Sequence, residues 1–192
     1  MEICIVGLPG SGKTFLENLL VEKKGFQKYT SHTTRQPREG EVDGENYYFV
    51  SKEKFNKMID NKEFIEWATV YDNYYGLSGK EVLGKGGNNI VSIKDPVGAE
   101  SLKKINPNVI TVYLEIEPSV SKARMEQRGD SKDSIEERMS NITYFKVFQK
   151  KADININNNV FRPEDELLEL LFREIKYRER WLWKNQIALT LD

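Results

Sequence analysis

Cysteine, histidine and long apolar runs are scarce in this chain of 192 residues. With one cysteine, Cys4, and one histidine, His32, it can build neither an internal disulfide nor a structural zinc site of cysteines and histidines. Its apolar runs are only a few residues long, so we expect neither a membrane-spanning helix nor a secretory signal. These absences predict a soluble, cytoplasmic protein.

An excess of charge of one sign is also absent, since 29 Lys and Arg residues face 30 Asp and Glu residues. This balance predicts no uniform basic field for a nucleic acid or a membrane surface, so an anion site must be built locally. The length suffices for one sizeable hydrophobic core and is short for two ordinary domains. We expect one compact domain that can bear inserts.

Short apolar strands alternate with helical patterns along the chain. Residues 3–6 are apolar, largely β-branched and followed by Gly7, which is typical of a strand buried on both faces. Residues 15–23 follow with helical spacing, and similar buried strands are predicted at residues 89–93 and 109–114. This alternation indicates an α/β fold with a parallel sheet.

Two internal segments and the tail depart from that alternation. Residues 31–80 are rich in aromatic and β-prone side chains, with strands expected at residues 47–50 and 64–71, and predict a small mixed β insert. Residues 119–150 are helical in pattern and rich in charge. Residues 164–189 predict a long final helix with one buried face, and we expect this tail to pack as part of the core.

The loop after the first strand carries the most specific motif. Residues 7–14 match G-x-x-x-x-G-K-[ST] between a predicted strand and a predicted helix, the context that a phosphate-binding loop requires. Its glycines let successive backbone N–H groups point inward, its lysine reaches the β- and γ-phosphates, and its threonine hydroxyl reaches Mg²⁺. The predicted nucleoside triphosphate site comprises Gly7, Pro9, Gly10, Ser11, Gly12, Lys13 and Thr14.

A first pair of arginines could meet a second phosphate. Arg35 and Arg38 flank Pro37, which prevents a helix, so the pair lies on a loop that can fork around one phosphate. Solvated surface arginines are the alternative interpretation. We interpret His32 as a surface loop residue rather than a general base, because phosphoryl transfer depends mainly on positioning and charge neutralisation.

A second group of arginines lies in the charged helical segment. Arg124 and Arg128 are four residues apart on one helix face, and Arg138 follows beyond a break at Gly129. These three side chains could close over bound phosphates. In the alternative interpretation they form ion pairs on a surface helix, with Glu126, Glu136 and Glu137 as the partners.

Residues 31–44, SHTTRQPREGEVDG, together with the later segments EFIEWA and NYYG, resemble the guanylate kinase family in order and spacing. The resemblance extends over roughly residues 1–159. It implies a P-loop kinase fold, a three-layer α/β sandwich with a parallel core sheet, a mixed β nucleoside-monophosphate-binding insert and a helical lid. The implied single domain has its core at residues 1–30, 81–118 and 151–192, its insert at residues 31–80 and its lid at residues 119–150.

The family transfers the γ-phosphoryl group of ATP, with Mg²⁺, to GMP or dGMP, and the resemblance implies the same reaction here. It further implies that Glu66 accepts hydrogen bonds from guanine N1–H and N2–H. Matching positions imply that the acceptor phosphate is held by Ser31, Arg35, Arg38, Tyr47 and Tyr75.

Further matches imply roles nearer the reacting phosphates. Asp95, at the end of a predicted strand, would order magnesium-bound water or the acceptor arginines, and Asn157 would approach the adenine. Arg124 and Arg128 would contact ATP, while Arg128 and Arg138 would neutralise the transferring phosphoryl group. The implied catalytic residues are therefore Lys13, Arg35, Asp95, Arg128 and Arg138.

The chain departs from the family pattern at three places. Leu77 stands where the family usually has a serine or threonine whose hydroxyl bonds guanine O6. Either Ser78, one position further on, or a backbone group substitutes for that hydroxyl, or the enzyme accepts a purine without this contact. Ile93 stands in place of a family aspartate, and the tail beyond residue 160 exceeds the resemblance. The alternative functions are a kinase for another or modified purine monophosphate and a non-catalytic binding module. The sequence leaves open whether the protein is a monomer or a homodimer.

Overall fold

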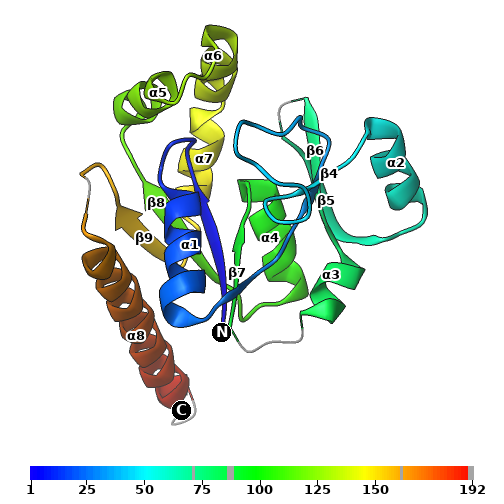
Figure 1. The fold of residues 1–192 in the computed structure, drawn as a ribbon. Coiled ribbons are helices and arrows are strands. Elements are labelled where there is room, and N and C mark those ends of the chain that lie inside the picture. The colour runs from blue at the N-terminus through cyan, green and yellow to red at the C-terminus, as the bar shows by residue number, and fades with distance from the viewer. Residues whose placement is uncertain (71, 86–88, 161, 190–192) are drawn as a thin grey trace.

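The computed structural model describes residues 1–70, 72–85, 89–160 and 162–189, which form two β-sheets surrounded by helices (Figure 1). All four pairings in the larger sheet are parallel. The strands predicted near residues 3–6, 89–93 and 109–114 are confirmed. The order of the five strands is β2 (Gln27–Lys28), β7 (Ile90–Ile93), β1 (Glu2–Gly7), β8 (Ile110–Glu115) and β9 (Ile154–Asn157).

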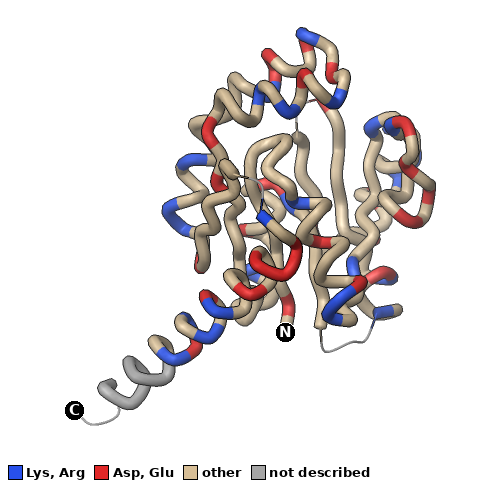
Figure 2. The backbone as a smooth tube through the Cα atoms, turned by 60° about the vertical axis from the view of Figure 1, so that its left-hand side comes forward, with Lys and Arg blue, Asp and Glu red and all other residues tan. Residues whose placement is uncertain are grey.

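Acidic and basic residues are mixed along the outer helices (Figure 2), as the balanced composition predicts. None of the helices in the described part of the chain combines the length and the apolar composition that crossing a bilayer requires.

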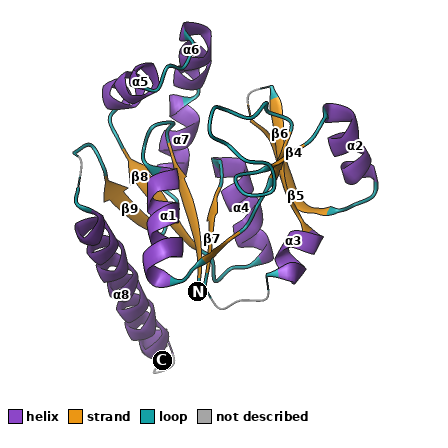
Figure 3. Cartoon of the chain, viewed as in Figure 1, coloured by secondary structure: helices purple, strands orange, loops and turns teal. Residues whose placement is uncertain are grey.

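Helices cover both faces of the larger sheet (Figure 3). The side chains of β1 alternate between these faces, with Ile3 and Ile5 on one and Cys4 and Val6 on the other. The first face is covered by α1 (Lys13–Lys24) and α8 (Glu164–Leu189), and the second by α4 (Pro96–Ile105) and α7 (Ile142–Gln149). Helix, sheet and helix therefore form the three layers that were predicted.

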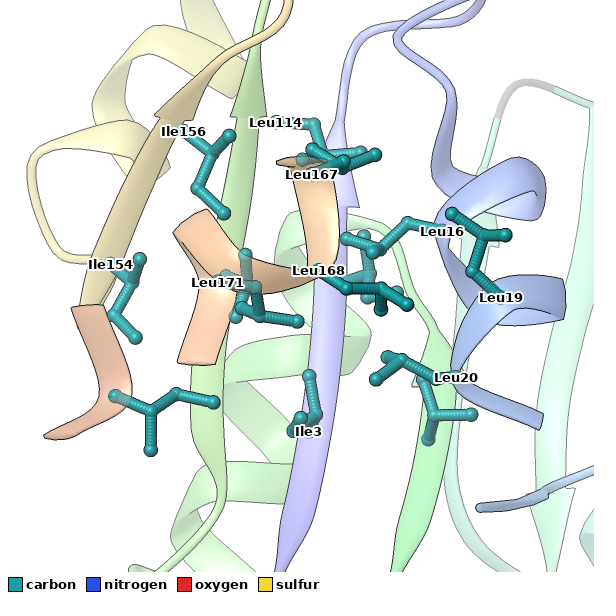
Figure 4. Close-up of a cluster of buried hydrophobic side chains, with 14 of the residues drawn as sticks. Ile3, Leu16, Leu19, Leu20, Leu114, Ile154, Ile156, Leu167, Leu168 and Leu171 are labelled. Atoms are coloured by element: carbon teal, nitrogen blue, oxygen red, sulfur yellow. The ribbon is translucent and has the colours of Figure 1, made fainter. Parts of the chain in front are cut away.

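The larger core lies between β1, α1 and α8 (Figure 4). Its leucines and isoleucines are nearly inaccessible to solvent, and full burial of each contributes about 1.5–3 kcal/mol. They include Ile3 from β1, Leu16, Leu19 and Leu20 from α1, and Leu167, Leu168 and Leu171 from α8. This packing holds the start of α1, and with it the loop at residues 7–14, against the sheet.

The long final helix is confirmed at the predicted residues, and its first half packs as core as far as Ile175. Among its side chains described beyond that point, through residue 182, Tyr177, Trp181 and Leu182 are exposed. Arg178 reaches back to Asp153, with a nitrogen 2.7 Å from the carboxylate. The expectation that the tail packs as core is therefore confirmed as far as Ile175 and does not hold for Tyr177, Trp181 and Leu182.

The smaller sheet has the order β4 (Tyr48–Phe49), β3 (His32–Thr33), β6 (Asn73–Ser78) and β5 (Phe64–Val70), flanked by α2 (Lys52–Asp60) and α3 (Gly79–Gly84). Its β3–β4 pair is parallel and its other pairs are antiparallel, which confirms the predicted mixed β segment. The Phe55 and Phe64 rings stack with centroids 4.4 Å apart. Gly76 permits this contact, because a Cβ there would lie 2.8 Å from the Phe64 ring. Residue 71, predicted in a strand, lies outside the described residues.

Three helices follow β8, namely α5 (Pro118–Gln127), α6 (Lys132–Ser140) and α7. They confirm the helical pattern predicted for residues 119–150. The predicted break is also confirmed at Gly129, whose φ of 86° is readily adopted only by glycine. Phe145 and Phe148 join α7 to the core, whereas α5 and α6 stand beyond the carboxyl end of β8 (Figure 1).

Candidate active site

One cavity of about 560 Å³ opens where the loop at residues 7–14, the smaller sheet and the helices α5 and α6 meet. It is lined by almost all of the predicted site residues, and also by residues that the sequence analysis did not single out. The predicted residues on its wall are Gly7, Pro9, Gly10, Gly12, Lys13, Thr14, Ser31, Arg35, Arg38, Tyr47, Glu66, Tyr75, Asp95, Arg124, Arg128 and Arg138. Ser11 and Asn157 are not among the lining residues.

The loop at residues 7–14 depends on glycines at two close contacts. A Cβ at Gly7 would lie 2.6 Å from the Leu114 carbonyl oxygen, and one at Gly12 would lie 2.8 Å from Asn158 Nδ2. Gly12 also has a φ of 93°, in the left-handed region. The loop therefore passes close to β8 and to the end of β9, and its backbone N–H groups collect at the start of α1.

Lys13 folds back over its own loop. Its Nζ donates to the carbonyl oxygens of Gly7, at 2.8 Å, and of Leu8, at 3.0 Å. Burial, with a smaller contribution from the nearby guanidinium groups of Arg128, Arg138 and Arg38, lowers the pKa of Lys13 to about 7. The cavity thus brings four cationic groups from three separate segments to one place. Such a site is suited to a polyanion.

Side chains from distant segments brace the loop. Ser121 Oγ donates to the Pro9 carbonyl oxygen at 2.7 Å, and Arg124 donates to that of Gly10 at 2.9 Å. Asn158 Nδ2 donates to the Ser11 carbonyl oxygen at 2.8 Å. Arg124, predicted to contact ATP, therefore holds the loop in shape, and its contact with a nucleotide stays a prediction.

The asparagine run near the end of β9 contacts the loop through a different residue from the one predicted. Asn157 is exposed, and its Oδ1 accepts from the Asn159 N–H at 3.2 Å. Asn158 is buried against the loop instead. The only indication in the sequence was the asparagine run, and the run does not show which of its asparagines is buried. The proposed approach of Asn157 to adenine stays a prediction.

The loop between β3 and β4 presents Arg35 and Arg38. Two Arg35 nitrogens donate to the two carboxylate oxygens of Glu41, each at 2.9 Å, and the Arg38 backbone N–H donates to Glu41 Oε2 at 2.7 Å. Although burial opposes it, these hydrogen bonds lower the pKa of Glu41 below its usual value. Glu41, which the sequence analysis did not assign, thereby orders both arginines.

Two tyrosines stand beside this pair of arginines. The Arg35 guanidinium lies 5.4 Å from the ring centroid of Tyr47, and the Tyr47 and Tyr75 rings meet edge to face at 5.9 Å. Burial raises the pKa of Tyr47, so its hydroxyl keeps its proton and can donate a hydrogen bond.

The arginines of α5 and α6 share one acidic partner. Arg128 donates to both carboxylate oxygens of Asp130, at 2.8 and 2.6 Å, and Arg138 donates to one of them at 3.0 Å. The surface ion pairs expected in the alternative interpretation, with Glu126, Glu136 and Glu137, are not the contacts that the structure gives these arginines. Asp130 instead holds both side chains, which line the cavity.

A buried ion pair lies on the cavity wall next to the smaller sheet. Lys94 Nζ is 2.5 Å from Glu66 Oε1 and 3.1 Å from Ser31 Oγ, and the Lys94 and Glu66 side chains are only 6% and 4% exposed. Ser31 therefore lies beside Glu66 and is linked to it through Lys94. No role was predicted for Lys94 from the sequence. A charged residue is nevertheless unusual directly after a buried strand such as β7.

Asp95 caps α4 and also faces the cavity. Its Oδ1 accepts from the backbone N–H groups of Val97, at 2.7 Å, and Gly98, at 3.1 Å. Burial raises the pKa of Asp95 despite these hydrogen bonds. A Cβ at Gly98 would lie 3.2 Å from Glu66 Oε2, so this glycine lets the Glu66 and Asp95 carboxylates approach the same wall.

Leu77 and Ser78 are not among the residues that line this cavity. Leu77 is fully buried with Tyr29 and Ile90 in a separate apolar cluster. Ser78 Oγ accepts from the Glu81 N–H at 3.3 Å and caps α3. The suggestion that Ser78 substitutes for a hydroxyl at position 77 is therefore wrong, because its side chain is used at the start of a helix.

His32 is placed differently from the prediction. It lies in β3 rather than in a loop, half-buried against the ring of Tyr48, with centroids 4.7 Å apart. It lines a second cavity on the far side of the smaller sheet and is absent from the lining of the first. It therefore takes no part in the candidate active site.

Within the described residues, no group of three or more histidine, cysteine or acidic side chains could hold a metal ion. Thr14, the predicted magnesium ligand, is exposed at the first turn of α1 and lines the cavity. A hard cation at this place would therefore take most of its oxygen ligands from bound phosphates and water.

Comparison with known proteins identifies the family of this chain. A family model described as guanylate kinase matches residues 1–173. The guanylate kinase of Photorhabdus laumondii is 38% identical over 97% of this chain and 94% of its own length. That of Syntrophus aciditrophicus is 35% identical over 99% of this chain and 93% of its own.

Two solved structures share the fold. A guanylate kinase from Anaplasma phagocytophilum has a TM-score of 0.70 at 23% identity, over 92% of this chain and 85% of that one. A shikimate kinase from Aquifex aeolicus has a TM-score of 0.52 at 18% identity, over 93% and 98%. These likenesses and the parallel core sheet confirm the predicted P-loop kinase fold class. Because the family model matches most of this chain, and the Photorhabdus laumondii and Syntrophus aciditrophicus relatives are 38% and 35% identical to it, the chain belongs to the guanylate kinase family, a family of nucleoside monophosphate kinases.

Proposed function

We propose that this enzyme transfers the γ-phosphoryl group of ATP, bound with Mg²⁺, to the phosphate of GMP or dGMP. The observation that supports this most directly is the meeting of Lys13 with Arg38, Arg128 and Arg138 in one cavity, where burial and the three arginines lower the pKa of Lys13 to about 7. Neighbouring cations disfavour one another's charged forms, and anions bound between them favour those forms. Two phosphate chains placed end to end would supply those anions.

The donor nucleotide occupies the loop side of the cavity. The backbone N–H groups of residues 7–14 hold its phosphates at the start of α1, and Lys13 leaves the Gly7 carbonyl oxygen for the β- and γ-phosphates. Thr14 offers its hydroxyl to Mg²⁺, which when bound neutralises phosphate charge. The Asp95 carboxylate, at the end of β7, orders the waters on that ion or the acceptor arginines.

The acceptor nucleotide occupies the side nearest the smaller sheet. Arg35, Arg38, Tyr47 and Tyr75 hold its phosphate, with Glu41 keeping the two arginines in place. Glu66 Oε2 is free to accept from the base, since Oε1 takes the Lys94 contact. The side chain of Ser31 lies near the base end of the cavity, although the resemblance assigns it to the phosphate.

The reaction itself needs positioning and charge neutralisation. Arg128 and Arg138 exchange Asp130 for the transferring phosphoryl group, and Arg124 keeps the loop in shape. In this proposal residues 119–150 act as a lid that pivots near Gly129 and excludes water, residues 31–80 bind the acceptor, and the remaining segments form the core. The enzyme forms no covalent intermediate, acts as a monomer or homodimer and works in the cytoplasm.

The test is steady-state phosphorylation of a panel of monophosphates with MgATP, in which we expect GMP and dGMP to have the highest kcat/KM. Equal or better turnover of a non-guanine base would favour the alternative that Leu77 suggests, a kinase for another or modified purine. Absence of turnover with every monophosphate would favour a non-catalytic binding module.

A further inference from the structure

Lys94 is a buried cation in the candidate active site that the phosphate chemistry does not use. Its Nζ contacts Glu66 Oε1 at 2.5 Å and Ser31 Oγ at 3.1 Å. We propose that Lys94 is a base-reading residue, whose ammonium donates a hydrogen bond to the 6-oxo group of the acceptor purine. This inference rests on the proposed function and identifies what replaces the missing hydroxyl at position 77.

The smaller sheet offers no donor of its own for a 6-oxo group at that position. Leu77 lies opposite Glu66 in the β5–β6 pair, but it carries no polar group and is fully buried in the cluster with Tyr29 and Ile90. Ser78 is used as the cap of α3. Neither residue lines the cavity, whereas Lys94 does. Leu77 and Ser78 of β6 therefore supply no side-chain donor for O6 of a purine that Glu66 binds. Lys94, directly after β7, can supply one.

The contacts of Lys94 leave one N–H for a ligand. A lysine ammonium carries three N–H donors and no acceptor. Within the described part of the chain, two of the three are directed to Glu66 and Ser31. Because both partners hold the ammonium beside the base-reading carboxylate, the third N–H is positioned before any substrate arrives.

The order of groups on guanine matches the order of groups on this wall. Guanine presents O6, N1–H and N2–H side by side, as one acceptor followed by two donors. The wall presents the Lys94 ammonium, Glu66 Oε1 and Glu66 Oε2, as one donor followed by two acceptor atoms. Gly98, whose missing Cβ would lie 3.2 Å from Oε2, leaves the second acceptor accessible. The pairing is therefore complementary at all three positions.

The same wall rejects adenine. Adenine presents a 6-amino donor beside an unprotonated N1 acceptor. The donor would face the Lys94 ammonium, and the acceptor would face a carboxylate oxygen. Two like-with-like contacts in a buried site leave polar groups without hydrogen bonds, which is the arrangement that discriminates most strongly.

The experiment compares kcat/KM for GMP, 6-thio-GMP and IMP in the wild-type enzyme and in Lys94→Met. Sulfur at position 6 is a weaker acceptor than oxygen, so 6-thio-GMP probes the Lys94 contact, and IMP, which lacks the 2-amino group, probes Glu66. We expect the wild type to prefer GMP over 6-thio-GMP by about 10-fold or more, as a hydrogen bond to a charged group permits. In Lys94→Met this preference should fall to about 2-fold or less, mainly through a change in KM. The ratio of kcat/KM for GMP to that for IMP should stay unchanged.

Two further variants keep the test decisive. Lys85→Met removes another lysine that pairs with a buried glutamate, Glu81, but lies outside the cavity, so its substrate ratios should equal those of the wild type. Lys94→Gln keeps an N–H donor without the charge, so it should retain part of the preference, and it serves if Lys94→Met loses its cooperative thermal transition.

The outcomes separate the two proposals. An unchanged ratio of GMP to 6-thio-GMP in both Lys94 variants, or an equal loss with all three substrates, overturns the role of Lys94 and leaves the proposed function standing. Absence of guanine monophosphate turnover in the wild type overturns the proposed function together with this inference.

Discussion

The Lys13 ammonium lies 2.8 Å from the carbonyl oxygen of Gly7, so the last part of the phosphate-binding loop closes onto its first residue. Lys13 must turn from this carbonyl toward a bound triphosphate. Lys13→Met removes the charge while keeping most of the aliphatic stem. We expect kcat/KM to fall by at least about 100-fold, as for loss of other preorganised charge donors. A neutral change alters kcat/KM by roughly 3-fold or less. An effect that small, in a variant with unchanged thermal stability, would contradict the role of Lys13.

Binding of the triphosphate should be coupled to proton uptake. Burial and three arginines lower the pKa of Lys13 to about 7 in the free protein, so at pH 8 most of this residue is neutral. Phosphates beside the ammonium raise its pKa again, and the bound form takes up a proton. Calorimetry at pH 8 in buffers of different ionisation enthalpy should detect uptake of nearly one proton, with less at pH 6. Lys13→Met should take up none, and equal uptake in both proteins would contradict the prediction.

Glu41 should act on the acceptor through the two arginines that it orders. Glu41→Gln weakens the paired contacts with Arg35 and the contact with the Arg38 backbone. We expect KM for the acceptor monophosphate to rise about 10-fold, since each charge-assisted bond contributes about 1.5–3 kcal/mol, while KM for ATP stays unchanged. The control is Glu39→Gln, on the exposed part of the same loop. A rise in both KM values would show a general loss of structure instead.

Glu17 should destabilise the protein above neutral pH. Burial raises the pKa of Glu17 from 4.5 to about 7, against the opposing influence of Lys28, Lys94 and Lys85. The folded state therefore binds the proton more tightly than the unfolded state, and stability falls as pH rises from about 4.5 to 7. Glu17→Gln should raise the free energy of unfolding by about 2–3 kcal/mol at pH 8 and by little at pH 5.

Denaturant unfolding at the two pH values measures this difference. Glu22→Gln changes an exposed glutamate of the same helix, so it should shift stability by less than about 0.5 kcal/mol at either pH. A stabilisation by Glu17→Gln that is equal at pH 5 and pH 8 would show that the ionisation of Glu17 is not its cause.

Leu77 should matter for stability and not for base preference. It is fully buried, so Leu77→Ala should lower the free energy of unfolding by about 2–5 kcal/mol through lost burial and the cavity left behind. Leu83→Ala, at an 85% exposed position of α3, should have almost no effect. The preference for GMP over 6-thio-GMP should be the same in both variants. A changed preference in Leu77→Ala would place position 77 at the base.

The strands, the helices and the phosphate-binding loop could be predicted because their signals are local. The apolar runs of β1, β7 and β8 and the spacing of residues 7–14 lie within a few neighbouring residues. The exposure of Tyr177, Trp181 and Leu182 in α8 could not be predicted from such a pattern, although the helix itself could. Helical periodicity does not report how far the partner surface extends.

The partners of the charged site residues were beyond the reach of sequence reasoning. The alternative interpretation paired the arginines of α5 and α6 with nearby glutamates, whereas Arg128 and Arg138 both contact Asp130. Lys94 and Glu66 are 28 residues apart and meet only because β7 and the smaller sheet face the same cavity. The preference of an ion for one partner over another depends on burial and distance, which spacing alone does not give.

By itself, the sequence determined that this chain folds as an α/β protein with a phosphate-binding loop and carries arginines in two further segments. Short stretches of sequence suffice for this, because glycine conformation, strand burial and charge depend mainly on neighbouring residues. Only the tertiary structure decided that these segments share one cavity, that Leu77 is buried with Tyr29 and Ile90 instead of lining it, and that Lys94 lines it. The physical reason is that a side chain on a strand faces whichever neighbour the packing of both sheets supplies, and that neighbour lies far away along the chain.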